Sequence, residues 1–86
     1  MNHYAGKSFW DGYNSLPQHI RDLADRNFQL LKENPSHPSL RFRDMGRFRS
    51  ARVGRAYRAL AVEVEDGYLW FWIGNHDEYE RIIDNR

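Results

Sequence analysis

The sequence contains no cysteine, which excludes disulfide bonds, thiol catalysis and thiolate metal sites. It also lacks any run approaching the roughly 20 apolar residues that span a bilayer, and residues 1–10 do not form a secretory signal. We therefore expect a cytoplasmic protein that does not contact a membrane. Its 86 residues suffice for one modest hydrophobic core, so we expect a single domain over residues 1–86.

Candidate metal ligands are scarce as well, because the histidines do not have the spacing of a histidine metal site. We therefore expect neither a metal nor another cofactor. The histidines are His3, His19, His37 and His76.

Positive charge is concentrated in one part of the chain, although the net charge is only +1. Residues 36–58 hold seven arginines against one aspartate, whereas residues 59–86 hold two arginines against seven acidic residues. Guanidinium groups bind phosphate in a bidentate manner and stay charged. We expect an anionic ligand, most simply nucleic acid, with a solvated strand surface as the alternative. These arginines are Arg41, Arg43, Arg47, Arg49, Arg52, Arg55 and Arg58.

Apolar spacing predicts helices in the first part of the chain. Residues 9–13 place aromatic side chains on one helix face, and residues 20–31 form a longer apolar stripe that ends at Asn34-Pro35. Ser15 and Gln18 have the spacing of a capping box. The pattern predicts an antiparallel helical hairpin with helices of about ten and about seventeen residues.

From residue 39 onward the apolar period is two, which is typical of strands. We predict an α+β domain in which the helical hairpin packs on a twisted, four-stranded antiparallel sheet. The last strand is apolar on both faces, so it should be central or covered on both sides. The expected strands are residues 39–45, 47–53, 57–65 and 68–73, and residues 78–84 are expected to form a short C-terminal helix.

The turn before the last strand decides which residues lie beside His76. If the turn is Asp66-Gly67, His76 faces Tyr57, and Arg58 points to the other face of the sheet. If the turn includes Glu65 as well, Arg58 lies opposite Gly74 and diagonal to His76. A three-residue turn over residues 54–56 would likewise place Arg52 opposite Arg58. Both registers remain open, because a slip of one residue moves every side chain to the other face.

Four runs of the sequence resemble the RelE/ParE superfamily of bacterial type II toxins over nearly the whole chain. They are LPQHIRDLADRNFQLL, HPSLRFRDM, RSARVGRAYRALAVEVEDG and WFWIGNHDEY. The resemblance implies a small α+β toxin with a cognate antitoxin. In ribosome-dependent members, basic side chains on the sheet hold mRNA in the ribosomal A site. The 2′-hydroxyl then attacks the adjacent phosphate without a metal.

The resemblance also implies the site residues. The sheet arginine of the family falls on Arg58 in YRAL, and the arginine of the preceding strand falls on Arg52. The C-terminal catalytic histidine of some members falls on His76, and the late tyrosine of others falls on Tyr79. The further arginines expected to bind RNA are Arg41, Arg43, Arg47, Arg49 and Arg55.

The chemistry of this reaction suits these residue types, because phosphodiester cleavage needs fixed cations and a proton donor for the leaving oxygen. Arg52 and Arg58 would supply the cations, and His76 would supply the proton. His76 could instead only cap backbone groups at the end of a strand, and Tyr79 could be structural or stack on a base. His37 is either a loop residue or the general base.

Three function classes follow. The first is an endoribonuclease toxin that acts on mRNA on the ribosome. The second is a ParE-like toxin that binds DNA gyrase and is not a nuclease. The third is an inactive toxin fold that is retained for binding an antitoxin or DNA.

Overall fold

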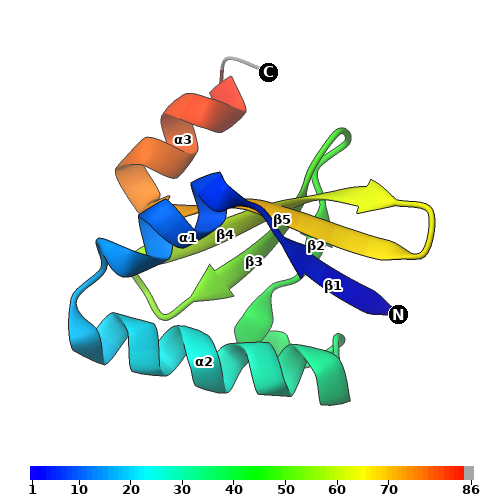
Figure 1. Ribbon diagram of the computed structural model, residues 1–86, viewed down its shortest axis with the longest axis horizontal. Helices are drawn as coiled ribbons and strands as arrows, with labels where there is room; N and C mark the ends of the chain where they lie inside the picture. The colour runs from blue at the N-terminus through cyan, green and yellow to red at the C-terminus, as the bar shows by residue number, and fades with distance from the viewer. Residues whose placement is uncertain (85–86) are drawn as a thin grey trace.

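The computed structural model describes residues 1–84, and residues 85 and 86 of the predicted domain lie outside the described residues. Three helices and a five-stranded sheet make up the chain, which confirms the α+β class (Figure 1). The elements are β1 (Asn2–Ala5), α1 (Lys7–Asn14), α2 (Gln18–Glu33), a short 3-10 helix η1 (Pro38–Leu40), β2 (Arg43–Asp44), β3 (Arg49–Val53), β4 (Tyr57–Val64), β5 (Gly67–Asn75) and α3 (His76–Asp84). Within residues 1–84, no helix combines the length and apolar character needed to cross a membrane.

The sheet has the strand order β1-β5-β4-β3-β2. The antiparallel meander and the central position of β5 are as predicted, but β1 adds a fifth strand parallel to β5. The prediction of four antiparallel strands is therefore wrong. The first predicted strand, residues 39–45, is also too long, because η1 takes up its start and only β2 is a strand. β1 is four residues long and lacks an apolar alternation, so its pairing depends on tertiary contacts. The Asp66 carboxylate accepts hydrogen bonds from Asn2 Nδ2 at 2.9 Å and from Tyr4 OH at 2.7 Å.

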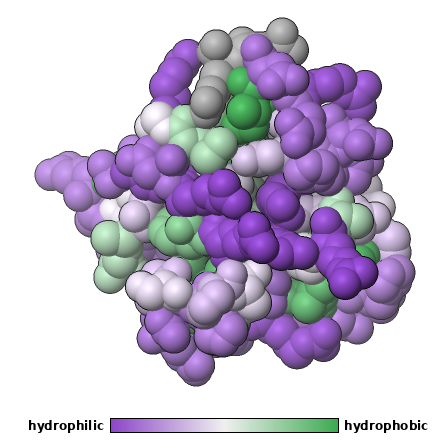
Figure 2. Space-filling view, turned by 180° about the vertical axis from the view of Figure 1, so that it is seen from behind, coloured by the Kyte–Doolittle hydropathy of each residue, from purple (hydrophilic) through white to green (hydrophobic). Residues whose placement is uncertain are grey.

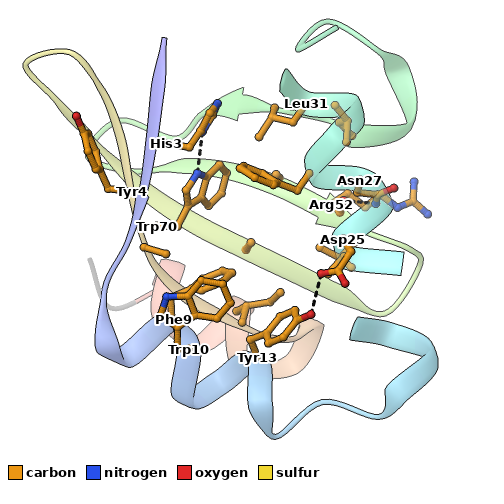
Figure 3. A pocket seen from close by; sticks show the side chains of 18 residues that line it. His3, Tyr4, Phe9, Trp10, Tyr13, Asp25, Asn27, Leu31, Arg52 and Trp70 are labelled. Carbon is orange, nitrogen blue, oxygen red and sulfur yellow. Dashed lines mark hydrogen bonds between the residues drawn. The ribbon is translucent and has the colours of Figure 1, made fainter. Parts of the chain in front are cut away.

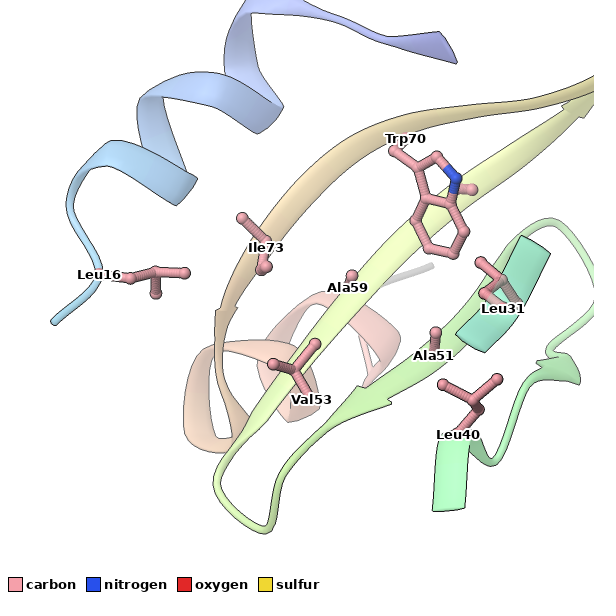
Figure 4. Packing of buried hydrophobic residues seen from close by; sticks show 9 residues of the cluster. Leu16, Leu31, Leu40, Ala51, Val53, Ala59, Trp70 and Ile73 are labelled. Atoms are coloured by element: carbon pink, nitrogen blue, oxygen red, sulfur yellow. The ribbon is translucent and has the colours of Figure 1, made fainter. Parts of the chain in front are cut away.

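The two N-terminal helices do not form the predicted hairpin. α1 packs on β5 and α2 packs on β3, with few contacts between the two helices. Gly12 allows the close approach of α1, because a Cβ there would lie 2.6 Å from the Ile73 carbonyl oxygen. Buried side chains from η1, α2 and three strands, together with Leu16, fill the space between the helices and the sheet (Figure 4).

The predicted capping box is also wrong. Ser15 is the C-cap of α1, and its hydroxyl donates to the Asp11 carbonyl oxygen at 3.0 Å. Pro17 takes the N-cap position of α2 and makes no side-chain cap. Only residues 15–17 separate the two helices. Ser15 therefore caps the C-terminal end of α1 and is not available to cap the N-terminal end of α2.

The turn between β4 and β5 consists of Glu65 and Asp66, and Gly67 is the first residue of β5. Neither turn considered from the sequence is therefore correct. This two-residue turn sets Val64 opposite Gly67. If that register continued along the hairpin, Arg58 would lie opposite Ile73 and not opposite Gly74.

A β-bulge restores that register. Between Leu60 and Ala61 the pairing shifts by one residue, and Phe71 is the extra residue on β5. Beyond the bulge Arg58 lies opposite Gly74, so the predicted pairing is confirmed, although a bulge and not a three-residue turn produces it.

Candidate nucleic-acid interface

Arg52 and Arg58 lie side by side on the face of the sheet that points away from the hydrophobic core. Arg52 is opposite Arg58, as predicted for a three-residue turn, and Gly54 in that turn has a φ of 65°. The neighbouring residues Ala51 and Ala59 point to the other face and are buried in the core. Viewed from behind, the molecule carries a band of strongly hydrophilic side chains across its middle (Figure 2). We call the face of the sheet that carries Arg52 and Arg58 the arginine face.

Main-chain carbonyls hold both guanidinium groups in place. Arg52 Nε donates to the Gly54 carbonyl oxygen at 2.8 Å, and Arg58 Nη1 donates to the Tyr57 carbonyl oxygen at 3.2 Å. Within residues 1–84, neither arginine forms an ion pair with an acidic side chain. Both side chains are half-buried and keep N–H groups that can bind an anion.

The electrostatics of the face favour an anionic ligand. Burial lowers the pKa of the Arg58 guanidinium, and the positive charges of Arg52, Arg43 and Arg41 lower it further. Arg58 still remains charged at neutral pH. Arg41 has a left-handed backbone conformation with φ 43°, which is uncommon for a residue with a side chain. A phosphate bound between these groups would relieve their mutual repulsion.

The remaining arginines of residues 36–58 do not all join this face. Arg49 lies on the other side of β3, and its guanidinium pairs with Asp44 at 3.1 Å and with Glu63 at 3.3 Å. We therefore leave Arg49 out of the proposed interface. Arg47 and Arg55 are exposed in the connections on either side of β3.

His76 is the first residue of α3, and its backbone N–H donates to the Ala56 carbonyl oxygen at 2.8 Å. The imidazole Nε2 lies 2.9 Å from a Glu80 carboxylate oxygen. Its Nδ1 is buried and makes no hydrogen bond with any group of residues 1–84. The side chain is 41% exposed, so the ring can still be reached from solvent.

Tyr79 joins Arg58 and His76. The Arg58 guanidinium carbon lies 5.7 Å from the centre of the Tyr79 ring, and the His76 ring stacks on it with centres 5.6 Å apart. Tyr79 is only 8% exposed, so its ring faces are not available to an incoming base. The structure thus brings Arg52, Arg58, Tyr79 and His76 together, and the Tyr79 ring contacts both Arg58 and His76.

His37 has a local role. Its Nδ1 accepts a hydrogen bond from the Ser39 backbone N–H at 3.2 Å and lies 2.9 Å from the Ser39 hydroxyl. These contacts cap η1, and they make His37 a loop residue in this structure.

Sequence reasoning missed two residues of the arginine face. Glu80 is one helical turn after His76, a spacing that could have indicated the contact. Trp72 lies opposite Leu60 on this face only because of the bulge. Without the bulge it would face Ala59 and point into the core, so no pattern in the sequence indicated its position.

A second surface feature lies on the core side of the sheet. An apolar groove of about 390 Å³ separates α1 from α2 (Figure 3). Trp10 and Phe28 on its walls are 48% and 38% exposed. At one end, Trp70 Nε1 donates to His3 Nδ1 at 3.0 Å, and burial lowers the pKa of His3.

Comparison with solved structures identifies the fold. The chain superimposes on a RelE toxin solved in a RelB–RelE antitoxin–toxin complex from Methanococcus jannaschii with a TM-score of 0.72 and 16% identity, over 92% of this chain and 96% of that one. The chain has a RelE-like toxin fold. The chain also superimposes on a copper-bound mutant toxin from Helicobacter pylori, with a TM-score of 0.64 and 17% identity over 91% of this chain and 97% of that one.

Comparison at the sequence level gives no further relative of this RelE-like chain, because neither the known protein families nor the curated proteins match it. Over residues 1–84, this RelE-like domain brings no three His, Asp or Glu side chains together in a group that could hold a metal ion.

Proposed function

We propose that the protein is the toxin of a type II toxin–antitoxin system and that it cleaves mRNA bound to the ribosome. One observation carries the proposal: Arg52, Arg58 and His76 converge on one face of the sheet, and Tyr79 contacts both Arg58 and His76. The RelE-like fold supports the toxin role, and the unpaired guanidinium groups support a phosphate ligand.

The proposed reaction is attack of the RNA 2′-hydroxyl on the adjacent phosphate. The 2′-hydroxyl loses its proton to a solvent water, and the bond from the 2′-oxygen to phosphorus forms as the bond from phosphorus to the 5′-oxygen breaks, which leaves a 2′,3′-cyclic phosphate and a 5′-hydroxyl end. Arg52 and Arg58 stabilise the negative charge that builds up on the phosphate oxygens. His76 gives a proton to the leaving 5′-oxygen, a step that accelerates such reactions about 100- to 10,000-fold.

Glu80 bears directly on this step. His76 Nε2 lies 2.9 Å from the Glu80 carboxylate, and Nδ1 is buried, so Nε2 is the nitrogen that can reach a substrate. In the reaction, Nε2 turns from Glu80 to the leaving oxygen. Glu80 thus holds the imidazole at Nε2 before the substrate binds and releases it for the proton transfer.

We further infer an antitoxin partner that covers the arginine face with an acidic segment. The RelE neighbour was solved in complex with RelB, and the Arg52 and Arg58 guanidinium groups have no acidic partner among residues 1–84, so an antitoxin would supply one. The exposed apolar walls of the groove give the same partner a second contact region. A neutralised complex in which Arg52 and Arg58 remain uncovered would contradict this mode of inhibition.

Pulse labelling after controlled expression tests the function. We expect protein synthesis to stop before DNA synthesis, and we expect Arg58→Ala to prevent the arrest. Arg49→Gln serves as the matched control, because Arg49 lies on the opposite face and is paired with acidic side chains. Failure of DNA synthesis first, with translation intact, would favour a ParE-like toxin that binds DNA gyrase.

A further inference from the structure

The indole of Trp72 completes a row that begins with two arginines. Arg52, Arg58 and Gly74 lie opposite one another on three adjacent strands. A Cβ on Gly74 would lie 2.6 Å from Trp72 Cζ2, so the six-membered ring of the indole lies over Gly74. The third position of the row is thus covered by a flat aromatic surface, and Arg58 is the directly opposed residue on the neighbouring strand.

The Trp72 side chain differs from those of Trp70 and Phe71 in its contacts. Trp70 donates a hydrogen bond to His3, and Phe71 packs against Phe48 with ring centres 5.4 Å apart. Within residues 1–84, the Trp72 indole N–H makes no hydrogen bond and its ring packs against no other aromatic ring. The side chain is only half-buried, so part of the indole is accessible on the arginine face.

We propose that Trp72 is a stacking platform for an unpaired nucleobase whose neighbouring phosphate is bound by Arg52 and Arg58. The ligand class is single-stranded nucleic acid, because the flat faces of the bases are covered in a duplex. Directly opposed residues on adjacent strands lie only about 5 Å apart, so one nucleotide can contact both the indole and Arg58. This inference rests on the proposed function and names how the same face would recognise RNA.

Tyr79 cannot fill this role, since its ring lies between Arg58 and His76 and is almost fully buried. Tyr79 and Trp72 therefore have different roles. Tyr79 positions the groups that act on the phosphate, and Trp72 contacts the base.

Two ligands separate base stacking from phosphate binding. A short single-stranded RNA carries bases and phosphates, whereas inorganic polyphosphate of similar charge carries phosphates alone. Both affinities are measured at the same salt concentration, because phosphate binding depends strongly on ionic strength. We expect Trp72→Leu to weaken RNA binding about 5- to 150-fold, the usual contribution of one stacked base, and to leave polyphosphate binding unchanged.

Further variants keep the test independent of folding. Trp72→Phe retains an aromatic face and should restore most of the RNA affinity. Gly74→Ala retains the indole but displaces it, because the new Cβ would collide with the ring, so it should weaken RNA binding alone. The control is Trp10→Leu, which removes an exposed tryptophan on the other side of the sheet and should change neither affinity.

Equal RNA affinity for Trp72→Leu and the unchanged protein would overturn the stacking role and leave the phosphate site standing. Absence of binding to both ligands would overturn the phosphate site and the stacking role together. RNA binding that depends on Trp72, combined with normal translation during expression, would overturn the proposed function and not this inference.

Discussion

The contact between Arg58 and Tyr79 allows a quantitative test of the site on the isolated protein. A cation within about 6 Å of an aromatic ring centre contributes 0.5–1 kcal/mol when exposed and about 2 kcal/mol when desolvated. Arg58 lies 5.7 Å from the ring and is half-buried. We therefore expect a coupling of about 1 kcal/mol between the two side chains.

A double-mutant cycle measures this coupling. Urea unfolding gives the free energy of unfolding for the unchanged protein, Tyr79→Leu, Arg58→Met and the double variant. Leucine keeps apolar volume without an aromatic face, and methionine keeps the aliphatic length without the charge. Tyr79→Phe keeps the ring, so its cycle with Arg58→Met should show almost no coupling. Additivity within about 0.3 kcal/mol for Tyr79→Leu and Arg58→Met would refute the positioning role of Tyr79.

Three further predictions concern other parts of the molecule. Because burial lowers the pKa of His3 below 6.5, and the N-terminal ammonium and Lys32 lower it further, the unfolded chain binds a proton first as the pH falls. Stability should be full above pH 6.5 and decrease below it, and urea unfolding at several pH values should show a smaller decrease for His3→Gln. Gly12→Ala should lower the free energy of unfolding by about 1–2 kcal/mol, since a clash with the Ile73 carbonyl outweighs the better helix propensity of alanine. Arg49→Gln should leave RNA affinity within about twofold in the same binding assay, because its guanidinium is already held by Asp44 and Glu63.

The register around Arg58 illustrates how far the sequence could lead. Glycine and acidic residues marked the position of the turn, and the apolar pattern of β5 correctly predicted its central place. The pairing of Arg58 with Gly74 depends on a bulge at Leu60 and Ala61, which no local pattern indicates. One of the two predicted registers therefore has the correct pairing of Arg58 with Gly74, but the bulge produces it and not the three-residue turn.

The first strand shows what local patterns leave out. β1 pairs with a strand more than 60 residues away, and its side chains bond to Asp66 in a distant turn. The acceptor carboxylate lies in the turn between β4 and β5, so no local pattern in residues 2–5 indicates these interactions. The burial of a side chain also depends on distant residues. From the sequence, Tyr79 could be structural or could stack on a base, and the packing of α3 against the sheet buries its ring.

Some features of the candidate site could be predicted from the sequence and others could not. The segregation of charge indicated an anion-binding segment, and the resemblance assigned Arg52, Arg58 and His76 to it. The separation of Arg49 from the others, the contact between Glu80 and His76, and the exposure of Trp72 follow from strand register and helix packing. The amino-acid composition does not predict these features, because each depends on the face of the strand or helix on which a side chain lies.

Single-turnover cleavage of mRNA in a programmed ribosomal A site tests the central proposal most directly. His76→Ala should slow cleavage about 100-fold or more while ribosome binding stays nearly unchanged, because it removes the proton donor and no phosphate contact. Arg58→Ala should lose about 3–4 kcal/mol of transition-state stabilisation, as removal of one donor from an oxyanion site does. Cleavage at the unchanged rate by both variants would contradict a nuclease site built on Arg58 and His76.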